Sequence, residues 1–416
     1  MKYLSYFLSF ILILSIIACS GSKEKENQPI NRYPIVDTTR PLSKDEKVIL
    51  SGIRNFGFNL FSKMITSETF KNKNLVISPF SISMALGMAL MGAEGETYQQ
   101  MSEVLGFPGM TTESVGENYK SLFLILENLD SSIDFDIANS VWIREGFPVY
   151  DSYISRCRDY FYASIFPDEP FDTATTSKLN NWVNEKTNGK ISKIVDRIPD
   201  TMVTMLVNAI YFFGKWTHPF DPGATHDDIF TNINGEVKKV SMMQHADKFK
   251  YLESENFKLL SLPYGNKKFY MTIILPDPGI SIYDLPATAL TDLFDLWSRA
   301  EEMEVKVELP RFEYSSPAIE VKDFLKTLGM VDPFLPDRAN FKGLTPKSNF
   351  FISNVMHKTY IKVDEKGTEA AAVTVVGAAV TCIREGPVFR VDHPFIFVIH
   401  DAKTKSPLFM GIITDI

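Results

Sequence analysis

Histidines, cysteines and paired carboxylates are the residue types in this chain that most often do chemistry. No His-Glu-x-x-His or Cys-x-x-Cys motif is present, and neither is a Gly-x-Ser-x-Gly elbow or a phosphate loop ending in Gly-Lys-Ser/Thr. A Ser-His-Asp triad can assemble from distant positions, but no local motif indicates one. The chain therefore predicts no enzyme, no cofactor and no metal. The six histidines are too dispersed for a local zinc site: His218, His226, His245, His357, His393 and His400.

The composition is that of a mildly acidic globular protein. Of 416 residues, 45% are hydrophobic and 23% are charged, which excludes a disordered or fibrous chain. Lysine and arginine total 43 against 51 acidic residues, for a net charge of −8, so nucleic acid is a poor candidate partner. Carboxylate pairs such as Asp227-Asp228 and Glu301-Glu302 are expected to be solvated surface charges.

The first residues resemble an export signal. Lys2 precedes an uncharged apolar run from Tyr3 to Ala18, which is short for a membrane-spanning helix of about 20 residues. Ile16-Ile17-Ala18-Cys19 resembles a lipobox, in which Cys19 is acylated and becomes the mature N-terminus. An ordinary signal peptide or membrane anchor with an incidental cysteine is the alternative. We expect a signal peptide over 1–18, and a location in the bacterial cell envelope, at the outer membrane or cell surface.

The remaining chain reads as one linker and one large domain. Residues 19–42 hold the lipidated cysteine and a polar, proline-containing linker, and 43–416 show no second linker and no internal repeat. Apolar periodicity predicts helices over 45–65, 81–91 and 177–198, and strand-like runs lie at 257–263, 269–275, 305–309 and 389–399. This pattern favours an α+β or mixed fold. Cys157 and Cys382, the cysteines left for the body, could pair; we expect free thiols.

One segment near the C-terminus is anomalous. The 14 residues from Ala370 to Ile383 carry no charge, no proline and no aromatic ring. Extended, they would span about 46 Å at roughly 3.3 Å each, whereas most strands have five or six residues. The segment is either an ordinary buried strand or a conditional strand, exposed in one state and inserted into a sheet in another. In the second case Thr368, Ala370, Ala372, Thr374, Val376 and Ala378 would share one face.

Four blocks resemble the serpin family, and they follow one another along the chain in the order that the family has them. Asp-Glu-Lys-Gly-Thr-Glu-Ala-Ala-Ala at 364–372 is similar to the serpin hinge, at the base of the reactive-centre loop. Residues 74–86 with 92–97 resemble the early strand-to-helix motif, and 207–216 the strand that enters the breach. Residues 391–395 and 406–411 resemble the C-terminal signature. The resemblance spans the whole body of the chain.

The resemblance implies a serpin fold, with three β-sheets, eight or nine helices and an exposed reactive-centre loop. It implies a monomeric suicide inhibitor: a target serine protease, or a cysteine protease, forms an acyl-enzyme with the loop. The cleaved loop then inserts into the central sheet and distorts the protease. A non-inhibitory serpin acting as a binding or chaperone module is the alternative, but bulky or charged hinge residues would then be expected.

The family's functional regions can be matched residue by residue. The hinge is Glu365, Gly367, Thr368, Glu369, Ala370, Ala371, Ala372 and Thr374. The shutter under the central sheet is matched by Ser78, Ser81, Asn208 and His357, and the breach by Trp216 and Glu365. A lone buried His357 can equally be a satisfied core histidine.

The scissile bond follows from the family's spacing. Sixteen positions after Glu365 lies Thr381, followed by Cys382. The preceding Ala378-Ala379-Val380 would suit elastase-like serine proteases or papain-like cysteine proteases. Cleavage after Val380 or Arg384 is the alternative, and Arg384 would suit a trypsin-like enzyme. Cys382 is expected to be an inert thiol, although its oxidation could tune inhibition.

Overall fold

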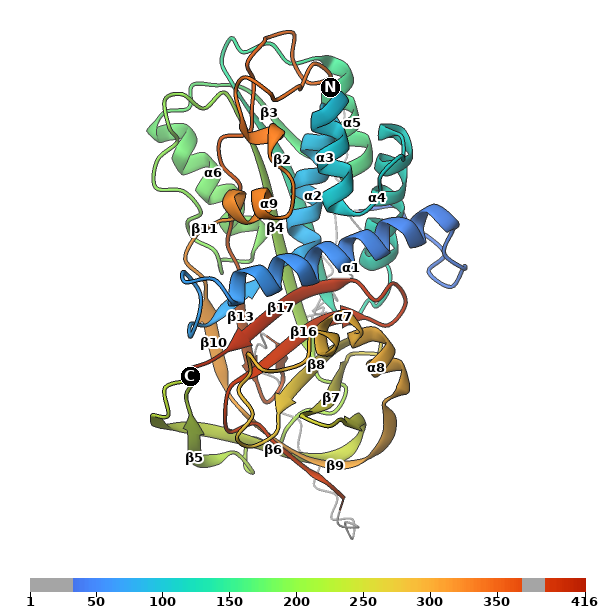
Figure 1. Ribbon diagram of the computed structural model, residues 1–416, viewed down its shortest axis with the longest axis vertical. Coiled ribbons are helices and arrows are strands. Elements are labelled where there is room, and N and C mark those ends of the chain that lie inside the picture. Colours follow the sequence, from blue (N-terminus) through green and yellow to red (C-terminus); the bar gives the residue numbers. More distant parts are fainter. Residues whose placement is uncertain (1–32, 369–385) are drawn as a thin grey trace, which may run out of the picture. The chain divides into compact units, whose positions relative to one another are not determined.

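The computed structural model of the chain describes residues 33–368 and 386–416 (Figure 1). A compact unit extends from Val36 to Ile416. The helices of the described ranges are α1 (Lys44–Ile65), α2 (Pro79–Leu90), α3 (Gly95–Leu105), α4 (Thr112–Glu127), α5 (Asp151–Phe161), α6 (Thr173–Lys186), α7 (Thr288–Thr291), α8 (Leu293–Arg299), α9 (Lys322–Thr327) and the 3-10 turn η1 (Asp332–Phe334).

Strands of the described ranges form three sheets. They are β1 (Leu75–Ile77), β2 (Asp134–Arg144), β3 (Ser164–Glu169), β4 (Thr204–Lys215), β5 (His226–Thr231), β6 (Val237–Glu253), β7 (Phe257–Tyr264), β8 (Phe269–Pro276), β9 (Glu301–Pro310), β10 (Phe312–Ser315), β11 (Ile319–Glu320), β12 (Met356–His357), β13 (Tyr360–Asp364), β14 (Gly367–Thr368), β15 (Val388–Arg390), β16 (Phe395–Asp401) and β17 (Pro407–Ile413).

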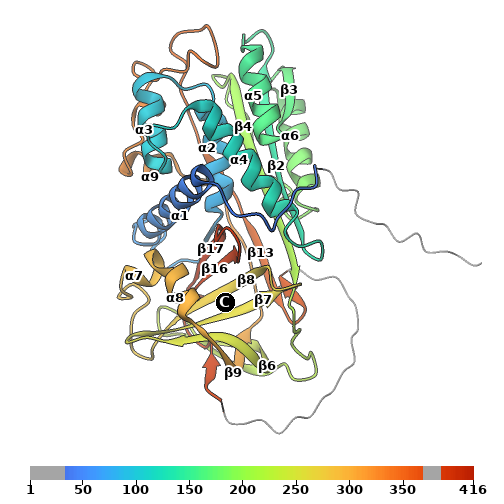
Figure 2. The same ribbon diagram turned by 90° about the vertical axis from the view of Figure 1, so that its right-hand side faces the viewer.

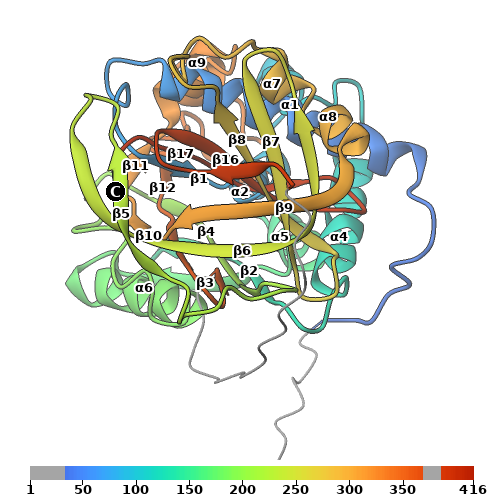
Figure 3. The ribbon, with the colours of Figure 1, turned by 90° about the horizontal axis from the view of Figure 1, so that it is seen from below.

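Two of these sheets build most of the molecule. A nine-stranded sheet has the order β1-β17-β16-β8-β7-β6-β9-β15, with β5 paired to β6. Figure 3 shows β6 and β9 running side by side across the lower end. A six-stranded sheet has the order β10-β13-β14-β4-β2-β3, and its long β2 and β4 pair over ten residues of each strand. The remaining sheet pairs β11 with β12.

The six-stranded sheet lies between helices α2 and α6 (Figure 2). Leu179 and Trp182 of α6 pack in one apolar cluster with Val207 and Ala209 of β4. Because side chains alternate along a strand, the even-numbered residues of β4 face the other way, toward α2. The two faces of β4 are therefore covered by different helices.

Helices α1 and α2 begin where their sequences provide caps. The Ser43 hydroxyl accepts from the Glu46 N–H, and the Glu46 carboxylate accepts from the Ser43 N–H, which completes a capping box. The Ser78 side chain accepts from the Ser81 N–H, and Pro79 occupies the first helical position, where its missing N–H costs nothing. The predictions of helices over 45–65 and 81–91 are confirmed.

The predicted helix over 177–198 is wrong in its second half. Helix α6 ends at Lys186, and Asn188 and Gly189 both have positive φ, which interrupts a right-handed helix. The Asn180 side chain instead holds the following segment, accepting from the N–H groups of Ile194 and Val195 at 2.9 and 3.2 Å.

The predicted strand over 389–399 is also wrong, because the structure divides it into β15 and β16. Pro394 has no N–H to give to a ladder, and the Asp392 carbonyl accepts from the N–H of Thr231, a residue of β5. The strands predicted at 257–263, 269–275 and 305–309 are confirmed as β7, β8 and β9.

Within residues 33–368 and 386–416, no helix combines the length and the apolar character needed to cross a membrane.

Candidate functional site

The central feature of the site is a position between two strands of the six-stranded sheet that, among the described residues, only the short strand β14 occupies. Strands β4 and β13 have no pairing with each other in the structure; both pair instead with the two residues of β14. Thr368 is opposite Gly214 on one side and Val363 on the other. Further along, a cavity of about 980 Å³ separates Thr204–Asn208 of β4 from residues 353–357, and α2 lines its floor. Among the described residues, no strand lies between Thr204–Asn208 and residues 353–357.

The breach lies where β14 enters the sheet. Trp216 is 4% exposed and makes two hydrogen bonds to the chain just before β14. Its backbone N–H donates to the Lys366 carbonyl at 2.8 Å, and its indole N–H donates to the Asp364 carbonyl at 3.0 Å. The Trp216 ring stacks on Tyr264, with centroids 4.4 Å apart. The Tyr264 hydroxyl and the Thr368 hydroxyl are 2.5 Å apart. The side chain of Thr368 thus faces the core side of the sheet.

Glu365 is buried at the breach and fully paired. The Arg311 Nε donates to both of its carboxylate oxygens at 2.7 and 2.9 Å, and the Thr225 hydroxyl donates to Oε1 at 2.5 Å. Burial alone would raise the pKa of Glu365, but the hydrogen bonds from Arg311 and Thr225 outweigh it and lower that pKa. A buried carboxylate with these partners remains ionised and holds the turn between β13 and β14.

The shutter residues meet beneath the sheet, at the edge of the cavity. The Ser78 N–H donates to His357 Nε2 at 3.0 Å, and the Ser81 hydroxyl donates to the Asn208 side-chain carbonyl. The Asn208 amide group donates to the Asn139 side-chain carbonyl at 2.6 Å. Strand β4 is thereby tied to α2 on one side and to β2 on the other.

Burial lowers the pKa of His357 to about 4. Because Nε2 accepts a hydrogen bond, the ring is neutral and carries its proton on Nδ1. A neutral ring is consistent with both interpretations of His357, as a shutter residue and as a satisfied core histidine.

A change from about pH 7.5 to about pH 5.0 should destabilise the protein, and His357 should account for roughly 2 kcal/mol of the loss. The pKa of His357 in the folded protein is below its unfolded value of 6.5. Unfolding therefore takes up a proton between these pH values, and the free energy of unfolding decreases as the pH is lowered. The urea midpoint of the wild type should therefore drop more between these pH values than that of His357→Gln, whose side-chain carbonyl can still accept the Ser78 N–H. An equal drop in both proteins would contradict this role. Burial also lowers the pKa of His400 to about 4, so His400 contributes to the loss of stability in both the wild type and the variant.

The comparisons with known proteins identify the family. The model of the serpin family, described as serine protease inhibitors, matches residues 51–416. The chain belongs to the serpin family. A serpin-like protein of Methanosarcina acetivorans is 34% identical over 424 residues, covering 96% of each chain, and human Serpin B8 is 34% identical over 368 residues, covering 86% of this chain and 96% of its own. The native-state crystal structure of the thermophilic serpin tengpin has a TM-score of 0.81 at 34% identity, covering 93% of this chain and 99% of its own.

The serpin fold expected from the sequence is confirmed, with three sheets and nine α-helices among the described residues. The structure brings Ser78, Ser81, Asn208 and His357 together, and places Trp216 and Glu365 around β14. The other expected residues lie outside the described ranges: Cys19, the hinge residues Glu369, Ala370, Ala371, Ala372 and Thr374, and the reactive-bond candidates Val380, Thr381, Cys382 and Arg384.

Several partners of these residues were not predicted from the sequence. Asn139 and Ser140 are adjacent polar residues in an otherwise apolar part of β2, and both are buried. Such a polar pair within an apolar run could have indicated a buried hydrogen-bond network. Arg311, Thr225 and Tyr264 had no local signal, because they approach the hinge from three separate strands or loops. Asp228 was expected to be solvated, but its side chain is only 18% exposed and pairs with Arg390.

Proposed function

We propose that this serpin is a suicide inhibitor, which traps its target protease by inserting its cleaved loop between β4 and β13. The observation that carries the proposal is the strand position between β4 and β13: of the described residues, β14 fills its first two places, and a cavity lies at its far end. The cleaved loop follows directly after β14 in the chain, so it can continue that strand.

The register of β14 supports this route. If the ladder continues from the pair Thr368–Gly214, Thr374 comes opposite Asn208, and Ala378 comes opposite Thr204. On the other side, the register from Thr368–Val363 brings Thr374 to the level of His357. The five residues from Thr374 to Ala378 would then enter the cavity lined by Thr204–Asn208.

One residue that lines the cavity has an unsatisfied side-chain group. The Thr204 hydroxyl is buried without a hydrogen-bond partner among the described residues, at the end of β4. Buried polar groups are costly when unpaired, so an added strand that supplies partners here would be favoured. The small residues of the segment suit insertion, because they need little space on either face.

The proposed target is a serine protease with a shallow apolar specificity pocket, with a papain-like cysteine protease as the second choice. Ala378-Ala379-Val380-Thr381 motivates this class, and Thr381–Cys382 is the proposed reactive bond. Residues 20–416 should be incubated with neutrophil elastase, trypsin, subtilisin and papain, followed by a denaturing gel and mass spectrometry of the released C-terminal peptide. An SDS-stable complex with elastase, and a peptide that begins at Cys382, are the expected results.

Cleavage by all four proteases without a complex would contradict the inhibitory proposal and favour the alternative, a binding or chaperone module. A complex with trypsin alone, and a peptide that begins at Glu385, would move the reactive bond to Arg384.

We further propose that acylated Cys19 anchors the serpin to the cell envelope. The support is the lipobox-like Ile16-Ile17-Ala18-Cys19 and the 17 residues from Cys19 to Ile35 that precede the compact unit. Fully extended, such a tether reaches about 60 Å from the membrane surface. In cells that export lipoproteins, the wild type should fractionate with membranes and take up labelled fatty acid, and Cys19→Ser should do neither; labelling of the variant would contradict acylation at this residue.

A further inference from the structure

The strand that follows the loop is short and lies at a sheet edge. Strand β15 has three residues, and it pairs in parallel with β9 through Val388–Lys306, Phe389–Val307 and Arg390–Glu308. Its backbone is flanked by two further bonds, from Lys306 N–H to the Pro387 carbonyl and from Val391 N–H to the Glu308 carbonyl. Three residues on one edge give few backbone hydrogen bonds, so side chains must contribute to holding this strand in place.

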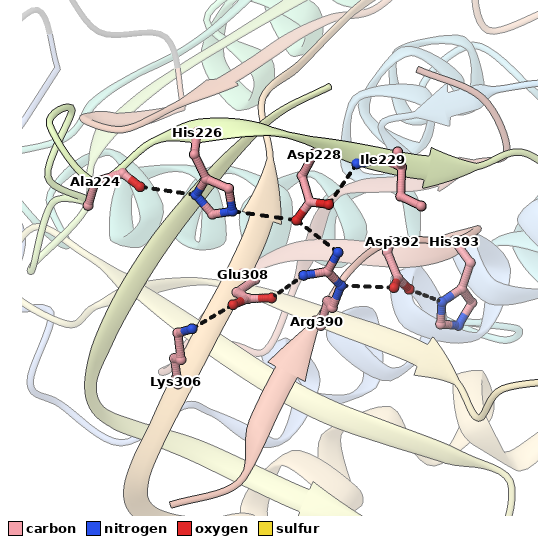
Figure 4. A network of polar contacts seen from close by, with 9 residues as sticks. All are labelled: Ala224, His226, Asp228, Ile229, Lys306, Glu308, Arg390, Asp392 and His393. Atoms are coloured by element: carbon pink, nitrogen blue, oxygen red, sulfur yellow. Dashed lines mark hydrogen bonds and ion pairs between the residues drawn. The ribbon is translucent and has the colours of Figure 1, made fainter. Parts of the chain in front are cut away.

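Arg390 provides these side-chain contacts (Figure 4). Its three guanidinium nitrogens reach three different carboxylates: Nη2 lies 2.8 Å from Asp228, Nη1 lies 2.7 Å from Glu308, and Nε lies 3.0 Å from Asp392. Asp228 belongs to β5, Glu308 to β9, and Asp392 to the turn that follows β15. These four residues are called the Arg390 cluster below.

The cluster is extended at each side by a second contact. Lys306 Nζ donates to Glu308 at 2.7 Å, and His226 Nε2 lies 3.5 Å from Asp228. His393 Nδ1 contacts Asp392 at 2.8 Å, and its Nε2 contacts the Pro276 carbonyl at 2.9 Å. The side chains of Asp228 and Glu308 are only 18% and 8% exposed, so the ion pairs are partly shielded from water.

The number of residues between β14 and β15 limits how far an uncut loop can insert while β15 stays on β9. Between the end of β14 and the start of β15 there are 19 residues, Glu369 to Pro387. If an uncut loop continued the β14 register to Thr204, it would use the chain as far as Ala378. The ten steps that remain to Val388 reach at most about 36 Å.

That reach is too short while β15 stays in place. From the level of Thr204, the chain would have to run back along β4 to the level of Gly214, which alone spans about 33 Å. Figures 1 and 2 show β15, the lowest red arrow beside β9, beyond the lower end of β4. An uncut loop therefore cannot fill the position between β4 and β13 unless β15 leaves β9. A cleaved loop has no such restraint.

We propose that Arg390 is a positioning residue that prevents the loop from inserting before it is cleaved. Its contacts with three carboxylates hold β15 against β9, against β5 and against the turn that follows β15. The proposal rests on the proposed function, since it concerns the same loop and the same strand position. Without Arg390, the carboxylates of Asp228, Glu308 and Asp392 lose their shared cation, and Lys306 contacts Glu308 alone. The three negative charges then repel one another, and β15 detaches more easily.

The test measures conversion in the absence of any target protease. Wild type and Arg390→Ala are incubated at a mildly elevated temperature, and samples are taken for thermal melting, intact mass and brief digestion with subtilisin. We expect Arg390→Ala to convert at least ten times faster to a form of unchanged mass, with a higher Tm and a loop that resists subtilisin. A tenfold rate corresponds to about 1.4 kcal/mol of barrier. Arg390→Lys should convert at an intermediate rate, because one ammonium cannot reproduce three separate guanidinium contacts.

Two controls separate a positioning role from simple destabilisation. Arg299→Ala removes one positive charge from the exposed surface of α8, and it should convert as slowly as the wild type. The double variant Arg390→Ala/Ala372→Glu carries a charge that the strand position should reject, and it should not convert. Conversion of Arg390→Ala at the wild-type rate would overturn the proposal. So would loss of the native form by unfolding, with no rise in Tm, in both the single and the double variant.

The outcome is separable from that of the protease experiment. If Arg390→Ala converts although the wild type traps no protease, the role of Arg390 is supported and the inhibitory function is rejected. If the wild type forms complexes and Arg390→Ala does not convert, only the role of Arg390 is rejected.

Discussion

Replacement of Ala372 with glutamate should change this serpin from an inhibitor into a substrate. The register of β14 would bring Ala372 opposite Ile210, which is 7% exposed and lies on the core side of β4. Insertion would then bury a carboxylate without a partner, at a cost of roughly several kcal/mol. Because insertion competes with deacylation, the number of serpin molecules cleaved per protease molecule trapped should rise at least tenfold.

The neighbouring position provides the matched control. Ala371 would come opposite Tyr211, on the other face of the inserted strand, where Lys190 Nζ lies 5.5 Å from the Tyr360 ring centroid. A glutamate at Ala371 would have a cation nearby, so Ala371→Glu should retain most of the trapping. The stoichiometry of both variants is read from denaturing gels with the protease that complexes the wild type. Undiminished trapping by Ala372→Glu would count against insertion in this register.

Replacement of Gly367 with alanine should destabilise the native state by roughly 2–4 kcal/mol. Gly367 has φ +154°, and a Cβ atom there would lie 2.0 Å from the Gly214 carbonyl oxygen. The backbone of β14 would have to move away from β4, which would also separate Thr368 from Tyr264. The urea midpoint and the rate of loop cleavage by dilute subtilisin should both report this change.

Gly146 separates the steric cost from the conformational cost. Gly146 also has a positive φ, of 72°, but a Cβ atom there would have nothing within 4 Å. Gly146→Ala should therefore cost only about 1 kcal/mol. Equal losses in the two variants would show that the close approach of β14 to β4 is not what makes a glycine necessary at Gly367.

The parts of the fold that depend on local patterns were predictable from the sequence. Helix α1 has both a capping box and a regular apolar face, and β7, β8 and β9 are compact apolar runs. The errors occurred where one or two backbone positions override a longer pattern. Asn188 and Gly189, with positive φ just after α6, interrupt an apparently helical stretch, and Pro394 separates β15 from β16 within an apparently continuous strand.

The site was predictable only through its resemblance to a family. Periodicity could not have joined Ser78, Asn208 and His357, which are far apart in the chain and meet only through tertiary packing. The separation of β4 and β13 in the described part of the chain is an absence of pairing, and no residue type encodes such an absence. The Arg390 cluster depends on the registers of three strands, so its carboxylates looked like ordinary surface charges.

The most direct test of the central claim is the thermal melting of the serpin before and after cleavage of its loop. The loop is cut with a protease that is then removed, and the cleaved chain is confirmed by mass. If the cleaved segment completes the sheet, the added backbone ladder and the filled cavity should raise the Tm by roughly 10 °C or more. A cleaved form that melts at or below the Tm of the intact protein would show that the loop does not enter the position between β4 and β13.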